Sequence, residues 1–122
     1  MAKVDVAREA RADLTEILWT SFDRWGEEGK ARYESLLEAA MQELAANPAH
    51  LRSKDCRELA PRLRSFHLRH VGRDHGVKAP VHVIFYRATR SSIVIIRVLH
   101  ERMEPSMHLS ATAQRVRHPR RT

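Results

Sequence analysis

The residues best suited to chemistry in this chain stand together in the stretch His100-Glu101-Arg102-Met103. At the end of a strand, alternate side chains point to opposite sides, so His100 and Arg102 share one side and Glu101 and Met103 the other. A histidine and an arginine on one side can act as a proton donor and a phosphate clamp, which is nuclease-like chemistry. The same pair can also receive a carboxylate from a partner or satisfy helix ends inside the domain. The spacing favours this structural or recognition role over catalysis.

The other histidines and the single cysteine lack the spacing of a metal or nucleophile site. His67 and His70 stand three residues apart in an expected strand, so their side chains point to opposite faces. His75 falls in an expected loop and His82 stands alone, with no acid or cysteine at ligand spacing. Cys56 has no placed histidine base and forms no internal disulfide. There is also no phosphate-binding glycine loop, so we expect no metal and no cofactor.

Basic residues are concentrated after residue 50. Residues 1–50 hold six Lys and Arg against ten Asp and Glu, whereas residues 51–122 hold 16 against five. This asymmetry predicts a basic face that attracts nucleic acid or an acidic protein segment, with unevenly solvated charge as the alternative. No stretch approaches the roughly 20 apolar residues of a membrane helix, and no signal peptide is recognisable. With one cysteine, the composition predicts a cytoplasmic protein without membrane contact.

The N-terminal half predicts a short strand followed by two helices. Residues 3–7 alternate polar and apolar side chains, as a strand does. Apolar residues then recur at three- and four-residue steps over residues 10–25, and Gly26 is a suitable helix stop because glycine tolerates left-handed backbone. A second apolar stripe begins after the polar EEGK stretch, covers residues 33–44 and stops at an Asn-Pro pair. We expect two antiparallel helices joined by a tight connection.

The following segment predicts one strand between two irregular stretches. Residues 48–63 form a polar connection in this interpretation. Residues 64–71 alternate, with Phe66 and Leu68 on one side, which is typical of a strand. Residues 72–80 hold two glycines and a proline. They predict a loop longer than most hairpin connections.

Two further strands complete the predicted sheet. Residues 81–88 and 92–99 are rich in β-branched and aromatic side chains, and a polar TRSS stretch turns the chain between them. Their apolar character on both faces predicts central strands that the helices cover on at least one face. Pro105 prevents a smooth continuation, and residues 106–116 have the pattern of a short helix. The order of elements predicts an α+β domain: an N-terminal short strand, a two-helix antiparallel hairpin and a small, mainly antiparallel sheet.

Several of these stretches together resemble a known family. The segments ARADLTEIL, WGEEGKARYESLLEAAMQELAANP, HVIFYR and IIRVLHERM are similar to the ParE branch of the RelE/ParE superfamily, the toxins of type II toxin–antitoxin pairs. The resemblance covers about residues 3–109 and implies the fold described above. We accordingly expect a RelE/ParE-like toxin domain at residues 1–109 and a basic, flexible C-terminal tail at residues 110–122.

The two branches of this superfamily imply different activities. RelE-type relatives cleave messenger RNA on the ribosome, using lysines, arginines and a late tyrosine. At the corresponding positions this chain holds Ser65, His67, Val83, Glu101 and Met107 or His108. Phosphodiester cleavage needs cations beside the phosphate, and a carboxylate there opposes it. The resemblance therefore implies a toxin that is not an enzyme, unless Arg64, Arg69 and Arg102 supply the missing charge from new positions.

ParE-type relatives inhibit DNA gyrase instead. The resemblance implies that this chain stabilises the cleaved-DNA complex of gyrase, with a possible indirect contact to DNA through gyrase, and is neutralised by a cognate antitoxin. Such inhibition needs only tighter binding to one state of the target enzyme. Two alternatives stay open: a RelE-like ribosome-dependent mRNA endoribonuclease with a rearranged basic site, and a non-toxic homologue that only binds the antitoxin.

The resemblance also implies a partner and a set of contact residues. The expected partner is a short acidic antitoxin that folds on binding, with an amphipathic helix beside the helical hairpin and an extended segment near the sheet. The residues expected to bind it are Trp25, Arg87, Arg97 and Arg102. Those expected to act on the target are His100, Arg102, Met103, Met107, His108, Arg115 and Arg117. His100 and Arg102 are expected to tie the sheet to the C-terminal segment. The basic tail either contacts DNA phosphate or gyrase, or is a solubilising end.

Overall fold

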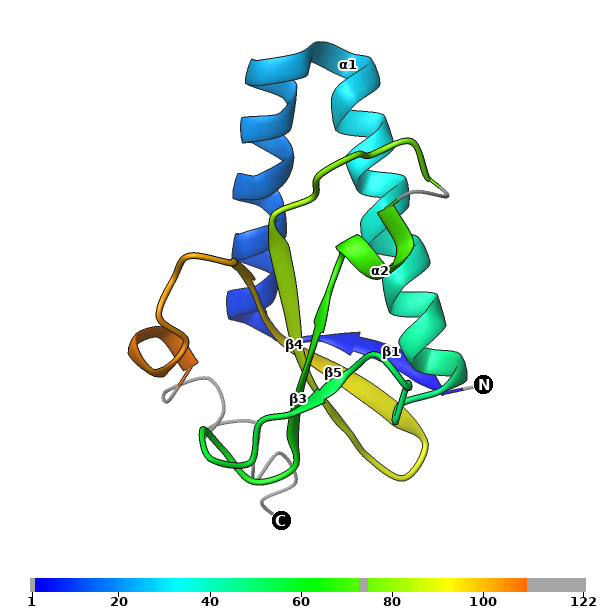
Figure 1. The fold of residues 1–122 in the computed structure, drawn as a ribbon, viewed down its shortest axis with the longest axis vertical. Coiled ribbons are helices and arrows are strands. Elements are labelled where there is room, and N and C mark those ends of the chain that lie inside the picture. The colour runs from blue at the N-terminus through cyan, green and yellow to red at the C-terminus, as the bar shows by residue number, and fades with distance from the viewer. Residues whose placement is uncertain (1, 73–74, 110–122) are drawn as a thin grey trace.

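One mixed sheet forms the centre of this computed structural model, which describes residues 2–72 and 75–109 (Figure 1). In this part of the chain the strands are β1 (Lys3–Val6), β2 (Lys54–Asp55), β3 (Leu63–His67), β4 (His82–Ala88) and β5 (Ser92–His100). Their spatial order is β1-β5-β4-β3-β2, with β1 parallel to β5 and the other neighbours antiparallel. The fold class is therefore α+β, as predicted. Arg115, Arg117 and the predicted tail at residues 110–122 lie outside the described residues.

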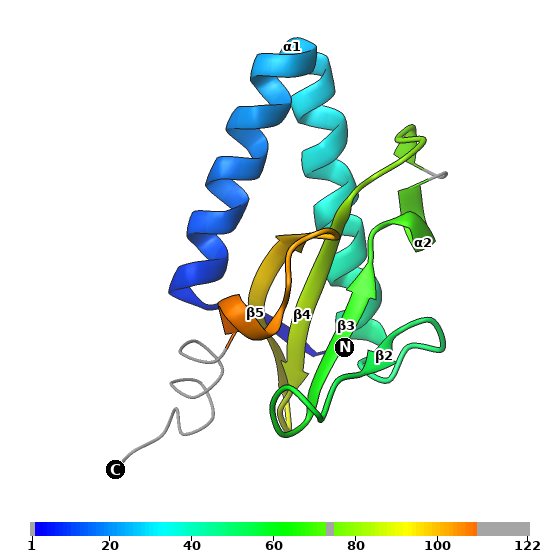
Figure 2. The same cartoon turned by 60° about the vertical axis from the view of Figure 1, so that its left-hand side comes forward.

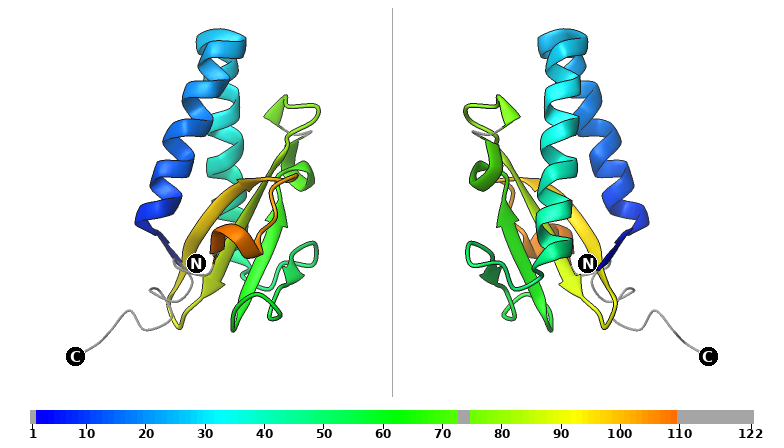
Figure 3. Two further views of the ribbon diagram at one scale, coloured as in Figure 1. Left: turned by 90° about the vertical axis from the view of Figure 1, so that its left-hand side faces the viewer. Right: turned by 90° about the vertical axis from the view of Figure 1, so that its right-hand side faces the viewer.

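Helix α1 (Arg8–Ala46) supplies most of the helical structure and reverses direction at Gly26. Gly26 has φ 74° and ψ −167°, a non-helical conformation with positive φ that glycine adopts without a Cβ penalty. We call residues 8–25 the first arm and residues 27–46 the second arm. The first arm leads away from the sheet and the second arm returns beside it (Figures 1 and 3). Helical backbone resumes immediately after Gly26, so the prediction that the second helix starts only after the EEGK stretch was wrong.

The arms of α1 cover one face of the sheet. Their buried apolar stripe packs against the side chains that β3, β4 and β5 present to that face, including Phe66, Ile84, Tyr86, Ile93 and Ile95. Burying each such side chain contributes about 1.5–3 kcal/mol relative to exposure. This cluster fixes the arms on the sheet and so sets the geometry of everything between them.

The opposite face of the sheet is covered by loops and by the C-terminal segment. A second buried cluster there consists of Ala7, Cys56, Ala60, Leu63, Phe85, Ile96, Leu99 and Leu109. After β5 the chain folds back across the sheet, and residues 106–109 make a helical turn that buries Leu109 (Figure 2). Both faces of β4 and β5 are therefore covered, as their two-sided apolar pattern predicts.

The region after β3 differs from its prediction. The strand expected at residues 64–71 ends at His67, and the short helix α2 (Arg69–Gly72) replaces its second half. After His67 the chain turns: the backbone N–H of Arg69 donates to His67 Nδ1 at 3.0 Å, and that of Val71 donates to the carbonyl of Leu68 at 3.0 Å. His67 and His70 thus do not share a strand, and the His70 ring lies 5.3 Å from the Phe66 ring. The two-residue strand β2 was also not predicted.

The hairpin of β4 and β5 agrees with its prediction to within one residue at each end. The pair contains a register shift between Phe85 and Tyr86, and Thr89 closes the turn by accepting from and donating to Ser92. His82 and His100 are paired across the two strands at the end of the hairpin farthest from this turn. No helix in the described ranges is long and apolar enough to cross a membrane.

Candidate partner-binding groove

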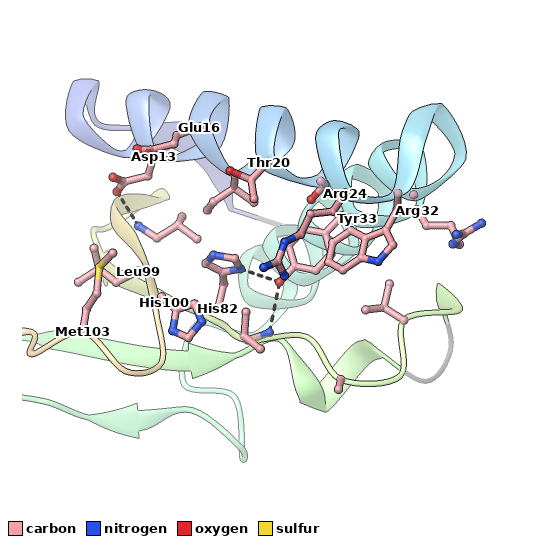
Figure 4. Close-up of a pocket in the computed structure, with 18 of the residues that line it drawn as sticks. Asp13, Glu16, Thr20, Arg24, Arg32, Tyr33, His82, Leu99, His100 and Met103 are labelled. Carbon is pink, nitrogen blue, oxygen red and sulfur yellow. Dashed lines mark hydrogen bonds between the residues drawn. The ribbon is translucent and has the colours of Figure 1, made fainter.

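A cavity of about 830 Å³ lies between the first arm of α1 and the ends of β4 and β5 (Figure 4). The start of the second arm and residues 76–81 complete its walls. We call this cavity the groove. Gly29 allows Trp25 to pack closely against the start of the second arm, because a Cβ there would lie 2.3 Å from Cβ of Trp25. The groove is large enough to take several side chains of a bound helix.

An ion pair fixes one end of the groove. Arg97 on β5 donates from Nε to Asp13 Oδ2 at 2.7 Å and from Nη2 to Asp13 Oδ1 at 2.9 Å. The backbone N–H of Val98 donates to the same carboxylate at 2.9 Å. Arg97 Nη1 also donates to the carbonyl of His108 at 2.7 Å. The hydrogen bond with Asp13 raises the pKa of Arg97. One guanidinium therefore joins the first arm, the sheet and the C-terminal segment.

Tyr33, His82 and His100 form the polar part of the groove floor (Figure 4). The Tyr33 hydroxyl lies 2.7 Å from His82 Nδ1 and accepts a 3.4 Å hydrogen bond from the backbone N–H of Val81. Burial raises the pKa of Tyr33 to about 12 and lowers the pKa of His82 to about 4. Both groups are therefore neutral at pH 7. The rings of His82 and His100 meet edge to face, with centroids 5.7 Å apart.

The rim of the groove combines positive charge with exposed apolar surface. Arg24, Arg32 and Lys78 all line it, and the Arg24 guanidinium carbon lies 5.8 Å from the centre of the Trp25 ring. The Trp25 residue is 58% exposed and Met103 is 45% exposed. A large exposed aromatic beside cations is typical of a surface that binds a protein segment carrying both apolar and acidic residues.

Comparison with known proteins identifies the family. Residues 4–105 match the family model described as “ParE toxin of type II toxin-antitoxin system, parDE”. The chain belongs to the ParE toxin family. Relatives named Toxin ParE1 include one from Mycobacterium tuberculosis (strain CDC 1551 / Oshkosh), 35% identical over 101 residues that cover 82% of this chain and 90% of the relative.

Further relatives agree with this assignment. A Toxin ParE1 of Caulobacter vibrioides is 33% identical over 104 residues, which cover 85% of this chain and 94% of that protein. The fold is similar to a solved structure titled “Chromosomal ParDE TA system from P. aeruginosa”, with a TM-score of 0.62 and 16% identity over 82% of this chain and 96% of that one. At this identity the structural likeness concerns the fold alone.

The groove of this ParE-family chain gathers five of the predicted site residues. They are Trp25, Arg97, His100, Met103 and His108. Arg97 bonds both to Asp13 and to the carbonyl of His108, so Arg97, rather than His100 and Arg102, ties the sheet to the C-terminal segment. His100 Nδ1 instead accepts the backbone N–H of Arg102 at 3.1 Å, a contact local to the strand end.

Three other predicted residues lie elsewhere. Arg87 is only 2% exposed and donates from Nε to the carbonyl of Pro61 at 3.0 Å, so its guanidinium faces the interior and we withdraw it as a surface contact for an antitoxin. Arg102 and Met107 are exposed but do not line the groove, and Met107 is 77% exposed.

Asp13, Tyr33 and His82 are groove residues that sequence reasoning missed. Tyr33 fell on the apolar stripe of the second arm and looked like a core residue, which its burial also supports. His82 looked isolated because its partners are 49 residues earlier and 18 residues later in the chain. Only the pairing of β4 with β5 brings the two histidines together, and no local spacing signals it.

Of the positions that correspond to the RelE-type catalytic residues, Ser65, His67, Val83 and Glu101 lie outside the groove, whereas His108 lines it. His67 Nε2 lies 2.6 Å from Glu101 Oε1, and His67 Nδ1 accepts the N–H of Arg69, so both ring nitrogens are occupied. The hydrogen bond to His67 lowers the pKa of Glu101. Within the described ranges, no three or more His, Cys, Asp or Glu side chains are grouped to hold a metal ion.

Proposed function

We propose that this ParE-family toxin is neutralised by an acidic antitoxin whose amphipathic helix lies in the groove. The observation that carries the proposal is the composition of the groove itself: the cations Arg24, Arg32 and Lys78 stand around an apolar interior that includes Ile17 and Val98. Such a surface suits a helix with one apolar face and flanking carboxylates. The structurally similar P. aeruginosa protein is described as part of a ParDE system, which supports a hetero-oligomer of this kind.

We further propose that the free toxin inhibits DNA gyrase by stabilising its cleaved-DNA complex. Family membership supports this activity. The side chains at the RelE-type positions support it too, because the carboxylate of Glu101 and the apolar Val83 stand where a nuclease would place cations. Inhibition then needs only preferential binding to the cleaved state, with no covalent step by the toxin.

The target is tested with purified components. Toxin added to gyrase, relaxed plasmid and ATP is expected to reduce supercoiling and to leave linear plasmid after protein denaturation. A parallel reaction with translating ribosomes and messenger RNA is expected to show no new cleavage. Codon-register cleavage there, with normal supercoiling, would replace the gyrase proposal with the ribonuclease alternative.

The partner is tested by binding. The protein encoded by the neighbouring reading frame is titrated into the toxin and into a variant with Arg24, Arg32 and Lys78 all changed to Glu. We expect binding to weaken by at least about 100-fold, because three attractive contacts become repulsive. Arg90→Glu, an exposed change in the β4–β5 turn outside the groove, is the matched control. Equal affinity of all three proteins would exclude the groove as the binding site.

A further inference from the structure

We propose that His82 and His100 form a two-donor cradle in the groove floor that receives one carboxylate of the antitoxin. The inference rests on the proposed function, because it specifies the side chain that the antitoxin brings to this groove. It rests on three features: the hydrogen bonds that place a proton on each imidazole, the placement of the two rings, and the charge around them.

The proton on His82 is placed by Tyr33. The Tyr33 oxygen accepts the backbone N–H of Val81, and the hydroxyl proton must be donated, since the phenol stays protonated when its pKa is about 12. His82 Nδ1, at 2.7 Å, is the acceptor. A neutral imidazole carries one N–H, so the proton of His82 is on Nε2.

The proton on His100 is placed by the backbone. The N–H of Arg102 can only donate, and it lies 3.1 Å from His100 Nδ1. Nδ1 is therefore an acceptor, and Nε2 of His100 carries a proton in either charge state. Among the residues that the structure describes, neither His82 Nε2 nor His100 Nε2 makes a hydrogen bond. Each is a donor available to a ligand.

The two donors are close enough to serve one ligand. His82 and His100 are directly paired across β4 and β5, both line the groove, and their ring centroids are 5.7 Å apart (Figure 4). A carboxylate has two oxygens, each able to accept one of these N–H groups. Because the acceptor is ionised, such hydrogen bonds are about twice as strong as neutral ones.

The surroundings favour an acidic side chain over a free anion. The nearest carboxylate in the groove, Asp13, is already paired with Arg97, so it does not compete for the histidines. Glu16 is the other acid on the lining, against the cations Arg24, Arg32 and Lys78. The apolar Ile17 and Val98, which also line the groove, would receive the neighbouring apolar side chains of a bound helix, which a phosphate ion lacks.

Paired substitutions separate the cradle from structural roles of the two histidines. Asn places an acceptor near the position of Nδ1 but removes the Nε2 donor, whereas Gln can supply a donor near Nε2. We expect His100→Asn and His82→Asn each to weaken binding of the antitoxin by about tenfold. His100→Gln is expected to stay within about threefold of the unaltered toxin. His75→Gln, outside the groove lining, is the control for loss of a histidine.

Two outcomes of these substitution experiments are decisive. Unchanged affinity of both Asn variants, with unchanged thermal unfolding, would overturn the cradle. Failure of the unaltered toxin to bind the antitoxin at all would instead overturn the proposed function, so the two failures are distinguishable.

A second measurement keeps the inference testable if an Asn variant misfolds. Each Asp and Glu of the antitoxin is changed to Asn or Gln, and the Nε2–H resonances of His82 and His100 in the unaltered toxin are followed by NMR. One antitoxin variant is expected to lose the shift that the unaltered antitoxin causes at both histidines. If no acidic position has this effect, or if inorganic phosphate alone reproduces the full shift, an antitoxin carboxylate is not the ligand.

Discussion

At the scale of single residues, the site depends on side chains whose partners are far away in the sequence. Asp13 and Arg97 are 84 residues apart, and Tyr33 and His82 are 49 residues apart. Each pair joins α1 to the sheet beside the groove. Residue spacing could not reveal these contacts: the position of Arg97 on β5 was predicted correctly, but its neighbour on α1 was not visible in the sequence.

Loss of the Asp13 carboxylate is expected to destabilise the fold. Asp13→Asn leaves the mostly buried Arg97 without its counter-charge, and the side chain of Arg97 is only 18% exposed. We expect a decrease in the free energy of unfolding of about 2–4 kcal/mol, measured by urea titration. Asp55→Asn removes the carboxylate of the exposed pair Asp55–Arg57 and is expected to cause a much smaller loss. Equal losses in the two variants would contradict a structural role of the buried pair.

Stability is expected to fall in acid because of His82. Its pKa of about 4 in the folded chain lies below the ordinary value of 6.5, since burial disfavours the imidazolium. The unfolded chain therefore takes up a proton first as pH falls. The stabilisation is complete above pH 6.5 and is lost progressively between pH 6.5 and pH 4. Urea titrations at pH 7.5, 6 and 4.5 measure this loss.

A variant isolates this contribution from other groups that titrate in the same range. In His82→Asn the loss between pH 7.5 and 4.5 is expected to be smaller than in the unaltered chain. The two proteins differ only at residue 82, so the difference between their pH profiles reports on His82 and on the charges that act on it. An identical pH dependence in the two chains would show that His82 does not titrate as described.

At the scale of elements, the spacing of apolar residues and the local content of β-branched residues predicted most of the secondary structure. The apolar steps of α1 and the β-branched runs of β4 and β5 are strong local signals, and the elements lie where these signals place them. The signals failed where a tertiary or backbone contact decided the outcome. After β3 the N–H of Val71 bonds to the carbonyl of Leu68 in a helical turn, although the residues there alternate as a strand would, and β2 is too short, at two residues, to have a period.

The reversal of α1 makes a prediction at this scale. Gly26→Ala is expected to lower the free energy of unfolding by about 1 kcal/mol, because a Cβ is disfavoured at φ 74°. Space is not the cause, since a Cβ at Gly26 would meet nothing within 4 Å. Gly26→Asn is expected to lose about as much, because Asn tolerates positive φ only in the left-handed helical region and not at ψ −167°. Thermal unfolding followed by circular dichroism measures both, and no loss in either variant would refute a conformational origin.

At the scale of the whole molecule, the charge asymmetry of the sequence does not locate the cations that surround the groove. The 16 basic residues after position 50 pointed to an anionic ligand, yet Arg24 and Arg32 of the groove rim belong to the acidic half. Folding brings them beside Lys78, which comes from the basic half. The fold class, the strand order near β4 and β5 and the family were accessible from sequence; the groove floor was not.

Association with the antitoxin is expected to depend strongly on salt. Screening weakens the attraction between exposed charges, and the Debye length falls from about 10 Å at 0.1 M to about 3 Å at 1 M. We expect the association rate constant to fall by about tenfold over this range, while the dissociation rate changes less. Stopped-flow fluorescence of Trp25 and Trp19 follows the reaction. A rate that is independent of salt would show that charge does not guide the encounter.

The parallel pairing of β1 with β5 has a consequence for biosynthesis. Lys3 to Val6 align with Ser92 to Ile95, so within the described ranges the first strand pairs only with the last. The sheet therefore stays incomplete until β5 has left the ribosome, and pairing β1 with β5 must close a long loop. A nascent chain that stalls before residue 92 lacks a central strand and one wall of the groove. The surface proposed to bind the antitoxin thus cannot form before β5 has been synthesised.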